Sequence, residues 1–189
     1  MKTFLHCCAV MLHRAGPETQ VTPVEQEVLT KYCRNAKVVV EIGCYEGNTT
    51  ALLAAHSTGI VYSIDPFFRG RLGFSYGKWI ARAYLRRRKL ANVKLVEGYS
   101  YAVAPRFAER IDFLFIDGDH TLNGVQRDWE DWLPKVRPGG IIAAHDCKVA
   151  INSPTRLGSM EYYDSCLAGL KELQEIESAH SLVVFRKAA

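Results

Sequence analysis

Hydrophobic residues along the chain gather in short runs that alternate with longer, helix-like segments. The runs fall at 38–42, 60–64, 93–96, 111–116 and 140–144. Most of them are almost continuously apolar, which is typical of strands that are buried on both faces. The segments between them read as helices, at about 48–57, 77–90, 100–108 and 121–133. Strands that alternate with helices predict a parallel sheet with right-handed crossovers.

The two ends of the chain differ from this middle part. Before the first run, Thr22 and Glu25 form the capping box of a predicted helix, and Pro23 suits its first position. After the last run, a helix near 160–171 precedes two short strands around a Ser-Ala-His-Ser turn. So close a connection joins antiparallel strands. The pattern predicts a Rossmann-like, doubly wound α/β fold, mostly parallel, with a C-terminal antiparallel hairpin.

Length and composition indicate one domain without a membrane span. The 189 residues suffice for a single core, and 48% hydrophobic and 23% charged residues are ordinary for a globular protein. No stretch approaches the roughly 18 consecutive apolar residues that a span needs. The first residues lack the pattern of a signal peptide, which predicts a cytoplasmic protein. We expect residues 1–20 to be an N-terminal extension and 21–189 to form the domain.

Cysteine spacing and charge exclude further classes. None of the six cysteines forms a C-x-x-C pair, so reduced thiols are expected rather than a zinc ribbon or a disulfide framework. The net charge of +4 includes a basic cluster at 86–89, in the last turn of a predicted helix, where cations suit the dipole. Because no pattern of aromatic and basic residues accompanies this cluster, no nucleic-acid partner is expected.

The stretch VVVEIGCYEGNTT, residues 38–50, ends the first predicted strand with an acidic residue and two glycines. In an open parallel sheet, ligands bind beyond the carboxyl ends of the strands, where Glu41, Gly43 and Gly47 lie. Glycines let a ligand approach the backbone, and the following helix offers free N–H groups. Asp65 ends the second strand, where its carboxylate would accept both hydroxyls of a ribose. The pattern predicts a nucleotide-like ligand.

This pattern leaves three functions open. A dinucleotide would make the protein an NAD(P)-dependent Rossmann oxidoreductase, but the third glycine of that motif is missing and Glu41 would place negative charge near phosphates. A cationic nucleoside such as S-adenosylmethionine has no phosphate and tolerates carboxylates nearby. A cofactor-binding module without turnover is the third alternative.

The same residues resemble a known family. VVVEIGCYEGNTT is similar to the first motif of class I S-adenosylmethionine-dependent methyltransferases. The similarity runs from about Val21 to the end and includes VYSIDP, VKLVEGYS and IDFLFIDGDHTLNGVQRDWEDWLPKVRPGGIIAAHD, which is its most specific part. The branch that it resembles comprises small-molecule O-methyltransferases, including catechol O-methyltransferase and the macrocin and cephalosporin-type tailoring enzymes.

The resemblance implies contacts with the cofactor from residues that follow the first four strands. They are Glu41, Gly43, Tyr45, Gly47, Asp65, Gly98, Tyr99, Ser100 and Asp117. The first four would surround the methionine moiety, and Asp65 would hold the ribose. Residues 98–100 would border the adenine, and Asp117 would lie beside the methyl sulfonium. Pro138-Gly139-Gly140 would be the turn into the fifth strand.

Ionisable residues also gather after the fourth and fifth predicted strands. They are Asp117, Asp119, His120, His145 and Asp146. These strand ends are neighbours beside the switch point, where convergent groups typically have shifted pKa values. Methyl transfer to oxygen needs an acceptor that loses its proton. The cluster could achieve this through a general base or through a bound cation.

The resemblance gives both alternatives candidate residues. In metal-dependent relatives, the positions of Asp117, His145 and Asp146 bind magnesium through oxygen atoms, but the middle residue here is a histidine. Imidazole suits ions such as manganese better than magnesium. The site would therefore hold magnesium through two carboxylates, hold another divalent ion, or use a histidine base without metal. His120 matches the lysine base of catechol-type enzymes, and His145 is the second candidate.

Two long loops, 66–79 and 147–163, open on the cofactor side and predict a lid and an acceptor pocket. Their Arg69, Arg71 and Arg156 could meet an anionic acceptor. The residues before Val21 could cover the site or a partner subunit of a homo-oligomer. The expected function is methyl transfer to a hydroxyl of a small molecule, such as a sugar or a natural product.

Overall fold

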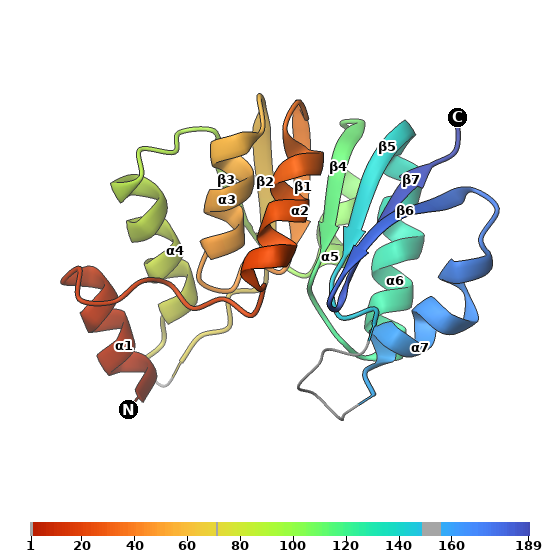
Figure 1. Cartoon of the computed structure of the whole chain (residues 1–189). Helices are drawn as coiled ribbons and strands as arrows, with labels where there is room; N and C mark the ends of the chain where they lie inside the picture. The colour runs from red at the N-terminus through yellow and green to blue at the C-terminus, as the bar shows by residue number, and fades with distance from the viewer. Residues whose placement is uncertain (1, 71, 149–155) are drawn as a thin grey trace.

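The computed structural model describes residues 2–70, 72–148 and 156–189. Its sheet has seven strands in the order β3-β2-β1-β4-β5-β7-β6 (Figure 1). They are β1 (Val38–Ile42), β2 (Ile60–Asp65), β3 (Val93–Glu97), β4 (Ile111–Ile116), β5 (Val136–Ala144), β6 (Leu173–Ala179) and β7 (Leu182–Lys187). The first five strands pair in parallel, whereas β7 is antiparallel to β5 and β6. The predicted doubly wound sheet with a terminal hairpin is confirmed.

Helices cover both faces of the sheet. They are α1 (Lys2–Met11), α2 (Pro23–Cys33), α3 (Asn48–His56), α4 (Tyr76–Arg87), α5 (Ser100–Val103), α6 (Leu122–Trp132) and α7 (Gly158–Ser165). On one face, Leu29 of α2 and Leu53 of α3 pack into a core cluster, and on the other Trp129 and Trp132 of α6 do so. All four side chains are almost completely buried. The strands are therefore covered by apolar residues on both faces, as their nearly continuous hydrophobic runs indicate.

Several element boundaries differ from the prediction, including those of the fifth strand and of the last helix. The fifth strand begins at Val136 and includes Pro138-Gly139-Gly140, which was expected to be a turn before it. A register shift against β4 between Ile111 and Phe113 accommodates this irregular start. The helix predicted at 160–171 ends at Ser165, because Cys166 leaves helical geometry, and the chain continues in a short 3₁₀ turn at Leu167–Gly169.

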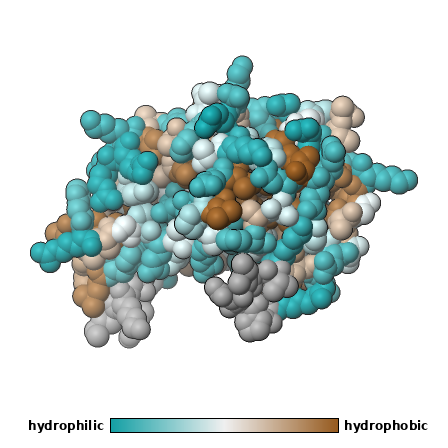
Figure 2. Space-filling model, in the orientation of Figure 1, coloured by the Kyte–Doolittle hydropathy of each residue, from teal (hydrophilic) through white to brown (hydrophobic). Residues whose placement is uncertain are grey.

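The N-terminal residues form a helix that packs against α4. Cys7 and Val10 of α1 make a small apolar cluster with Ile80 of α4. Other apolar side chains of α1, including Phe4 and Leu5, remain exposed. Figure 2 shows this face of the molecule as mostly hydrophilic, with apolar residues in separate groups. No helix in the described part of the chain is long and apolar enough to cross a bilayer.

Candidate cofactor cavity and active site

A cavity of about 750 Å³ lies at the carboxyl ends of the parallel strands. The loops after β1, β2, β3 and β4 meet there, joined by the segment that precedes α2. The wall comprises residues 18–20, 42–45, 48–49, 64–68, 75, 77, 99–100 and 117–120. This is the place where ligands bind in open α/β sheets, because the strand order reverses between β1 and β4.

Six of the nine residues predicted to surround a cofactor line the cavity. They are Gly43, Tyr45, Asp65, Tyr99, Ser100 and Asp117. The wall does not include Glu41, Gly47 or Gly98. The structure therefore brings most of the predicted set together, while Glu41 and Gly47 have structural roles.

Two glycines allow the loop after β1 to fold tightly at the sheet edge. Gly43 has a φ of +94°, and a Cβ at this position would lie 2.0 Å from the carbonyl oxygen of Asp117. Gly47 has a φ of +80°, and a Cβ there would meet the Cβ of Ala81 in α4 at 2.9 Å. A larger residue at Gly43 would push the loops after β1 and β4 apart. Gly47 lets α3 and α4 approach, and it does so without touching the cavity.

Asp65 ties the loops after β1 and β2 together. Its Oδ2 accepts hydrogen bonds from the backbone N–H groups of Cys44 and Tyr45, both at 3.0 Å. Its Oδ1 accepts from the N–H of Phe67 at 2.6 Å. Because a carboxylate can accept about four hydrogen bonds, the group retains capacity for a ligand hydroxyl in the cavity that it lines.

Glu41 is turned into the interior, away from the cavity. Its Oε2 accepts hydrogen bonds from the hydroxyls of Thr50 in α3 and Ser63 in β2, both at 2.5 Å. Complete burial raises the pKa of Glu41 to about 8, despite these two hydrogen bonds. The predicted contact of Glu41 with a methionine moiety is thus not supported, because the side chain is a protonated link between β1, β2 and α3.

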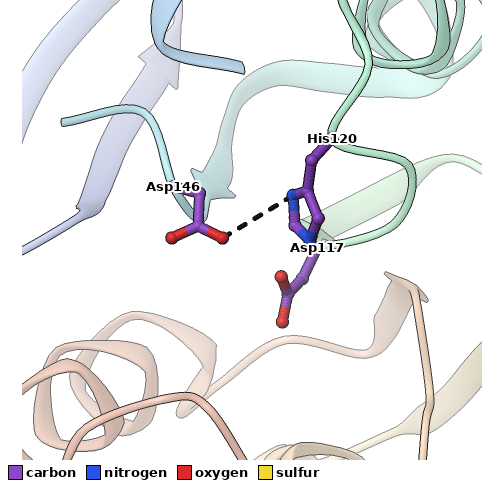
Figure 3. A group of neighbouring side chains, drawn as sticks. All are labelled: Asp117, His120 and Asp146. Carbon is purple, nitrogen blue, oxygen red and sulfur yellow. Dashed lines mark ion pairs between the residues drawn. The ribbon is translucent and has the colours of Figure 1, made fainter. Parts of the chain in front are cut away.

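Asp117, His120 and Asp146 converge beside the cavity, where the loops after β4 and β5 meet (Figure 3). Each of them offers one ligand atom, and these atoms all lie within 4.8 Å of one another. The Nδ1 atom of His120 is 3.6 Å from Oδ2 of Asp146. Asp117 and His120 line the cavity, and all three side chains are partly exposed. The group is therefore accessible to a ligand and could also hold a divalent ion.

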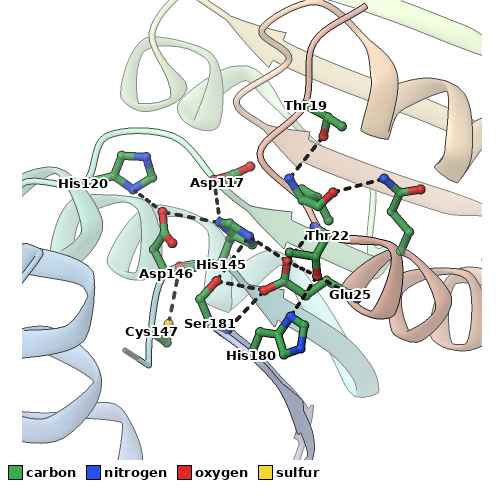
Figure 4. Close-up of polar contacts among 12 residues, drawn as sticks. Thr19, Thr22, Glu25, Asp117, His120, His145, Asp146, Cys147, His180 and Ser181 are labelled. Carbon is green, nitrogen blue, oxygen red and sulfur yellow. Dashed lines mark hydrogen bonds and ion pairs between the residues drawn. The ribbon is translucent and has the colours of Figure 1, made fainter. Parts of the chain in front are cut away.

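His145 lies behind this group, with only 4% of its side chain exposed (Figure 4). Its Nδ1 atom is 3.4 Å from both Oδ1 of Asp117 and Oδ2 of Asp146, and its Nε2 atom is 3.4 Å from Oε2 of Glu25. Burial opposes a charge on this ring, but the three carboxylates outweigh burial and raise the pKa of His145 to about 12. The three carboxylates therefore favour the protonated form of the ring.

The two roles predicted for His145 stay predictions, and the structure places its Nδ1 atom beside both Asp117 and Asp146. A protonated ring has no lone pair, so in this state His145 would neither ligate a metal nor remove a proton. Asp117, His120 and Asp146 could hold a divalent ion. The Nδ1 atom of His145 has no hydrogen-bond partner among the described residues and lies 3.4 Å from the same two carboxylates. Asp146 has a φ of +55°, and its Oδ2 atom lies 3.4 Å from Nδ1 of His145 and 3.6 Å from Nδ1 of His120. His145 points inward, and Asp146 reaches His120.

Glu25 belongs to this network, although its sequence pattern indicated only a helix cap. The capping box is present, with Oε2 accepting from the N–H of Thr22 at 2.8 Å. Its Oε1 accepts from the N–H and the hydroxyl of Ser181, in the turn between β6 and β7, at 3.1 and 2.9 Å. Burial would raise the pKa of Glu25, but hydrogen bonds from His145 and Thr22 lower it to about 2. No local pattern indicated the partners outside the cap.

The two predicted substrate loops are described in part. Phe68 in the first loop is exposed, and its ring meets that of Tyr99 edge to face across 6.1 Å at the cavity wall. Arg71 and residues 149–155 lie outside the described residues. Arg156 forms an ion pair with Asp164 at 2.9 Å, and Arg69 is not part of the cavity wall. The structure therefore does not bring Arg69 or Arg156 to the cavity.

A family model described as a methyltransferase domain matches residues 40–147, which is more than half of the chain. The match includes the glycine loop, Asp65 and the group formed by Asp117, His120 and Asp146. The chain belongs to this methyltransferase-domain family. The matched residues comprise most of β1, all of β2 to β5, and the helices α3, α4, α5 and α6.

Solved structures share the fold of this methyltransferase-domain protein at low identity. An O-methyltransferase from Bacillus cereus in complex with SAH has a TM-score of 0.71 and 20% identity, covering 99% of this chain and 91% of that chain. The O-methyltransferase TomG from Streptomyces achromogenes, solved with SAM, has a TM-score of 0.70 and 16% identity, covering 100% and 91%. An rRNA methylase from Streptococcus thermophilus has a TM-score of 0.65 and 16% identity, covering 91% and 100%. These likenesses establish the fold, and the fold accommodates different acceptors.

A curated relative adds a short match. The uncharacterised protein y4gI of Sinorhizobium fredii is 38% identical over 39 residues. That match covers 21% of this methyltransferase-domain chain and 4% of the length of the relative. It therefore bears on neither the acceptor nor the activity.

Proposed function

We propose that this methyltransferase-domain protein transfers a methyl group from S-adenosylmethionine to a hydroxyl group of a small molecule. The observation that carries the proposal is the charge of the cavity wall. Among the described residues, the wall contains the carboxylates of Glu18, Asp65, Asp117 and Asp119 together with His120, and neither lysine nor arginine. The cavity is therefore negatively charged.

This charge favours S-adenosylmethionine over NAD(P). A dinucleotide carries negative phosphates, which four carboxylates in a partly enclosed cavity would repel. S-adenosylmethionine carries a sulfonium and an ammonium group against one carboxylate, so its net charge is positive. The acidic wall thus complements this cofactor and disfavours the oxidoreductase alternative.

The wall residues have separate roles in this proposal. Asp65 accepts hydrogen bonds from the ribose, and the aromatic rings of Phe68 and Tyr99 border the adenine. Asp117 faces the sulfonium, close to where Gly43 brings the loops after β1 and β4 together. Bound there, S-adenosylmethionine would supply an electrophilic methyl group beside Asp117 and His120.

His120 is the proposed general base for the acceptor hydroxyl. It lines the cavity, and Asp146 lies 3.6 Å from its Nδ1 atom, which leaves Nε2 to take the proton. A positioned base typically contributes about 10²- to 10⁴-fold to the rate. Asp146 would hold the ring and stabilise the imidazolium that forms.

A divalent cation would bind to Asp117, His120 and Asp146 if the reaction uses one. Two carboxylates and an imidazole suit an ion such as Mn²⁺ better than Mg²⁺, which prefers oxygen ligands. When bound, such an ion would lower the pKa of an acceptor hydroxyl. His120 cannot ligate an ion and remove a proton with the same nitrogen, so chelation distinguishes the two schemes.

A thermal-shift comparison tests the cofactor. S-adenosylhomocysteine at 100 times its dissociation constant should stabilise the protein by about 2.7 kcal/mol, whereas NAD and NADP should leave it unchanged. Asp65→Asn should weaken the S-adenosylhomocysteine response, and Asp164→Asn, an exposed aspartate that pairs with Arg156, should not. A response to NAD alone would contradict the proposal.

A methyl-transfer screen tests the acceptor. Labelled S-adenosylmethionine is offered with a panel of sugars, phenols and aliphatic alcohols and, separately, with ribosomal RNA. Transfer to a small hydroxyl compound supports the proposal, and transfer to RNA alone would contradict its acceptor class. Activity that persists in EDTA supports His120 as the base, and activity that only Mn²⁺ restores supports the cation. Cofactor binding without transfer to any compound favours the non-catalytic module.

A further inference from the structure

The segment before α2 forms one wall of the cavity. Glu18, Thr19 and Gln20 line it, on the side of Tyr45 in the loop after β1. These residues precede the part of the chain that the methyltransferase-domain family model matches. The N-terminal segment is therefore part of the candidate site, and beyond the charge of Glu18 its residues have no role in the function proposed above.

Two hydrogen bonds hold Glu18 in this wall. Its backbone N–H donates to Oε2 of Glu46 at 2.6 Å, and the same oxygen lies 2.9 Å from Nε2 of His6. Glu46 belongs to the glycine loop and is only 3% exposed, so its hydrogen bond attaches the segment to a buried side chain of that loop. The hydroxyl of Tyr45 donates to Oε2 of Glu18 at 2.8 Å. Both the backbone and the carboxylate of Glu18 are thus fixed to the loop after β1.

The carboxylate of Glu18 has one oxygen available to a ligand. Across the described residues, its Oε1 accepts no hydrogen bond from the protein, and Oε2 accepts the one from Tyr45. Asp65, by contrast, already accepts from three backbone N–H groups, and Asp117 lies 3.4 Å from the ring of His145. Glu18 is therefore an acid of the cavity wall with an oxygen available to a ligand.

The order of the strands gives the direction of a bound cofactor. Asp65 and Tyr99 follow β2 and β3, whereas Asp117 follows β4, on the other side of β1. A nucleoside held by Asp65 and Tyr99 therefore extends its tail toward the loops after β1 and β4. The tail of S-adenosylmethionine is an amino acid, and its ammonium group is a primary cation with N–H donors. Glu18 lines the cavity beside the loop after β1, where its carboxylate contacts the hydroxyl of Tyr45.

We propose that Glu18 recognises the ammonium group of the amino-acid tail of the cofactor, with Tyr45 and Glu46 holding it in position. The contact is a charge-assisted hydrogen bond from the ammonium to Oε1, in which the proton stays on nitrogen. The proposal rests on S-adenosylmethionine as the cofactor. It makes the N-terminal segment a determinant of cofactor specificity.

Titration calorimetry with two ligands tests the contact. S-adenosylhomocysteine has the amino-acid tail, and 5′-methylthioadenosine is the same nucleoside thioether without it. Glu18→Gln should weaken binding of S-adenosylhomocysteine about 10-fold or more and change binding of 5′-methylthioadenosine less than 2-fold. Glu18→Gln should also weaken binding of decarboxylated S-adenosylhomocysteine, which keeps the amine, by the same factor as it weakens binding of the intact compound. The matched control is Glu27→Gln, because Glu27 is an exposed acid of α2 outside the cavity, and it should change neither affinity.

The outcomes separate this inference from the proposed function. Wild-type protein that binds neither S-adenosylhomocysteine nor 5′-methylthioadenosine would contradict the proposed function. If wild type binds S-adenosylhomocysteine and the Glu18→Gln variant binds it with the same affinity, the role of Glu18 is overturned and the proposed function is not. An equal loss for both ligands would also overturn the role of Glu18, since the effect would then lie at the nucleoside. Retained binding of 5′-methylthioadenosine shows at the same time that the variant is folded.

Discussion

Glu25 and His145, 120 positions apart in the sequence, form a buried ion pair with 3.4 Å between Oε2 and Nε2. Glu25 lies in the first turn of α2, and His145 follows β5. The pair therefore connects the N-terminal helix to the strand end that carries Asp146. Because both side chains are almost inaccessible to water, removal of either partner leaves a buried charge with less compensation.

Replacement of Glu25 by glutamine should destabilise the protein by about 1–3 kcal/mol. Glutamine can still serve in a capping box, but it removes the negative charge that faces His145. Thr22→Ala, which removes only the cap hydroxyl, should cost about 1 kcal/mol. Urea denaturation at pH 6 measures both. A loss for Glu25→Gln that does not exceed the loss for Thr22→Ala would show that the ion pair adds no stability.

The same pair predicts how this difference depends on pH. The folded pKa of Glu25, about 2, lies below its ordinary 4.5, so its contribution is present above pH 4.5 and is lost as the pH falls toward 2. The folded pKa of His145, about 12, lies above its ordinary 6.5, so its contribution is present below pH 6.5 and declines as the pH rises toward 12. The difference in the free energy of unfolding between wild type and Glu25→Gln should therefore be largest between about pH 4.5 and pH 6.5. A constant advantage from acid to alkaline pH would contradict the charge assignments.

Glu41 should stabilise the protein less as the pH rises, whereas Glu25 stabilises it more as the pH rises from about 2 to 4.5. Glu41→Gln should therefore remove a pH dependence of opposite sign to the one that Glu25→Gln removes on the acid side. The folded pKa of Glu41, about 8, lies above its ordinary 4.5, so its contribution is present below pH 4.5 and is lost as the pH rises through 8. The free energy of unfolding of wild type, relative to the variant, should fall in this interval by up to about 1.4 kcal/mol per pH unit. Denaturation series at several pH values measure this slope. The control is Glu27→Gln, because Glu27 is exposed, and wild type and this variant should show no such pH-dependent difference in the free energy of unfolding. If Glu41→Gln and Glu27→Gln behave alike, the buried carboxyl of Glu41 is not protonated.

Gly43→Ala should disrupt both stability and cofactor binding. A Cβ would approach the carbonyl oxygen of Asp117 to 2.0 Å, and the positive φ adds strain of about 1–3 kcal/mol. The affinity for S-adenosylhomocysteine should fall at least about 10-fold, because the substitution separates the loops after β1 and β4, and both loops line the cavity. Gly16→Ala is the control, because no atom lies within 4 Å of its added Cβ, and it should shift stability by less than about 0.5 kcal/mol. Unchanged calorimetric affinity in Gly43→Ala would show that the close approach is not required.

The fold could be predicted because the information for it is local. Each buried strand is an apolar run, and each run is followed by a helix, so the order of the elements and the place of Gly43, Asp65 and Asp117 at strand ends follow directly. The inward turn of His145 could not be predicted in this way. It depends on the backbone at Asp146 and on Glu25, which reaches the ring only when α2 packs beside β5. Contacts of this kind arise from long-range packing, and a single sequence carries no local signal for them.

The two histidines after β4 and β5 should separate chemistry from stability. His120 is about one-third exposed at the cavity wall, so His120→Gln should change the free energy of unfolding by less than about 0.5 kcal/mol. It should lower the kcat of methyl transfer about 10²- to 10⁴-fold, because it removes the proposed base. His145→Gln removes the cation among three buried or half-buried carboxylates and should cost about 3–5 kcal/mol of stability. Urea denaturation and steady-state kinetics with an acceptor from the screen measure both effects. Full activity of His120→Gln, or a His145→Gln variant that is as stable as wild type, would reverse this assignment of the two residues.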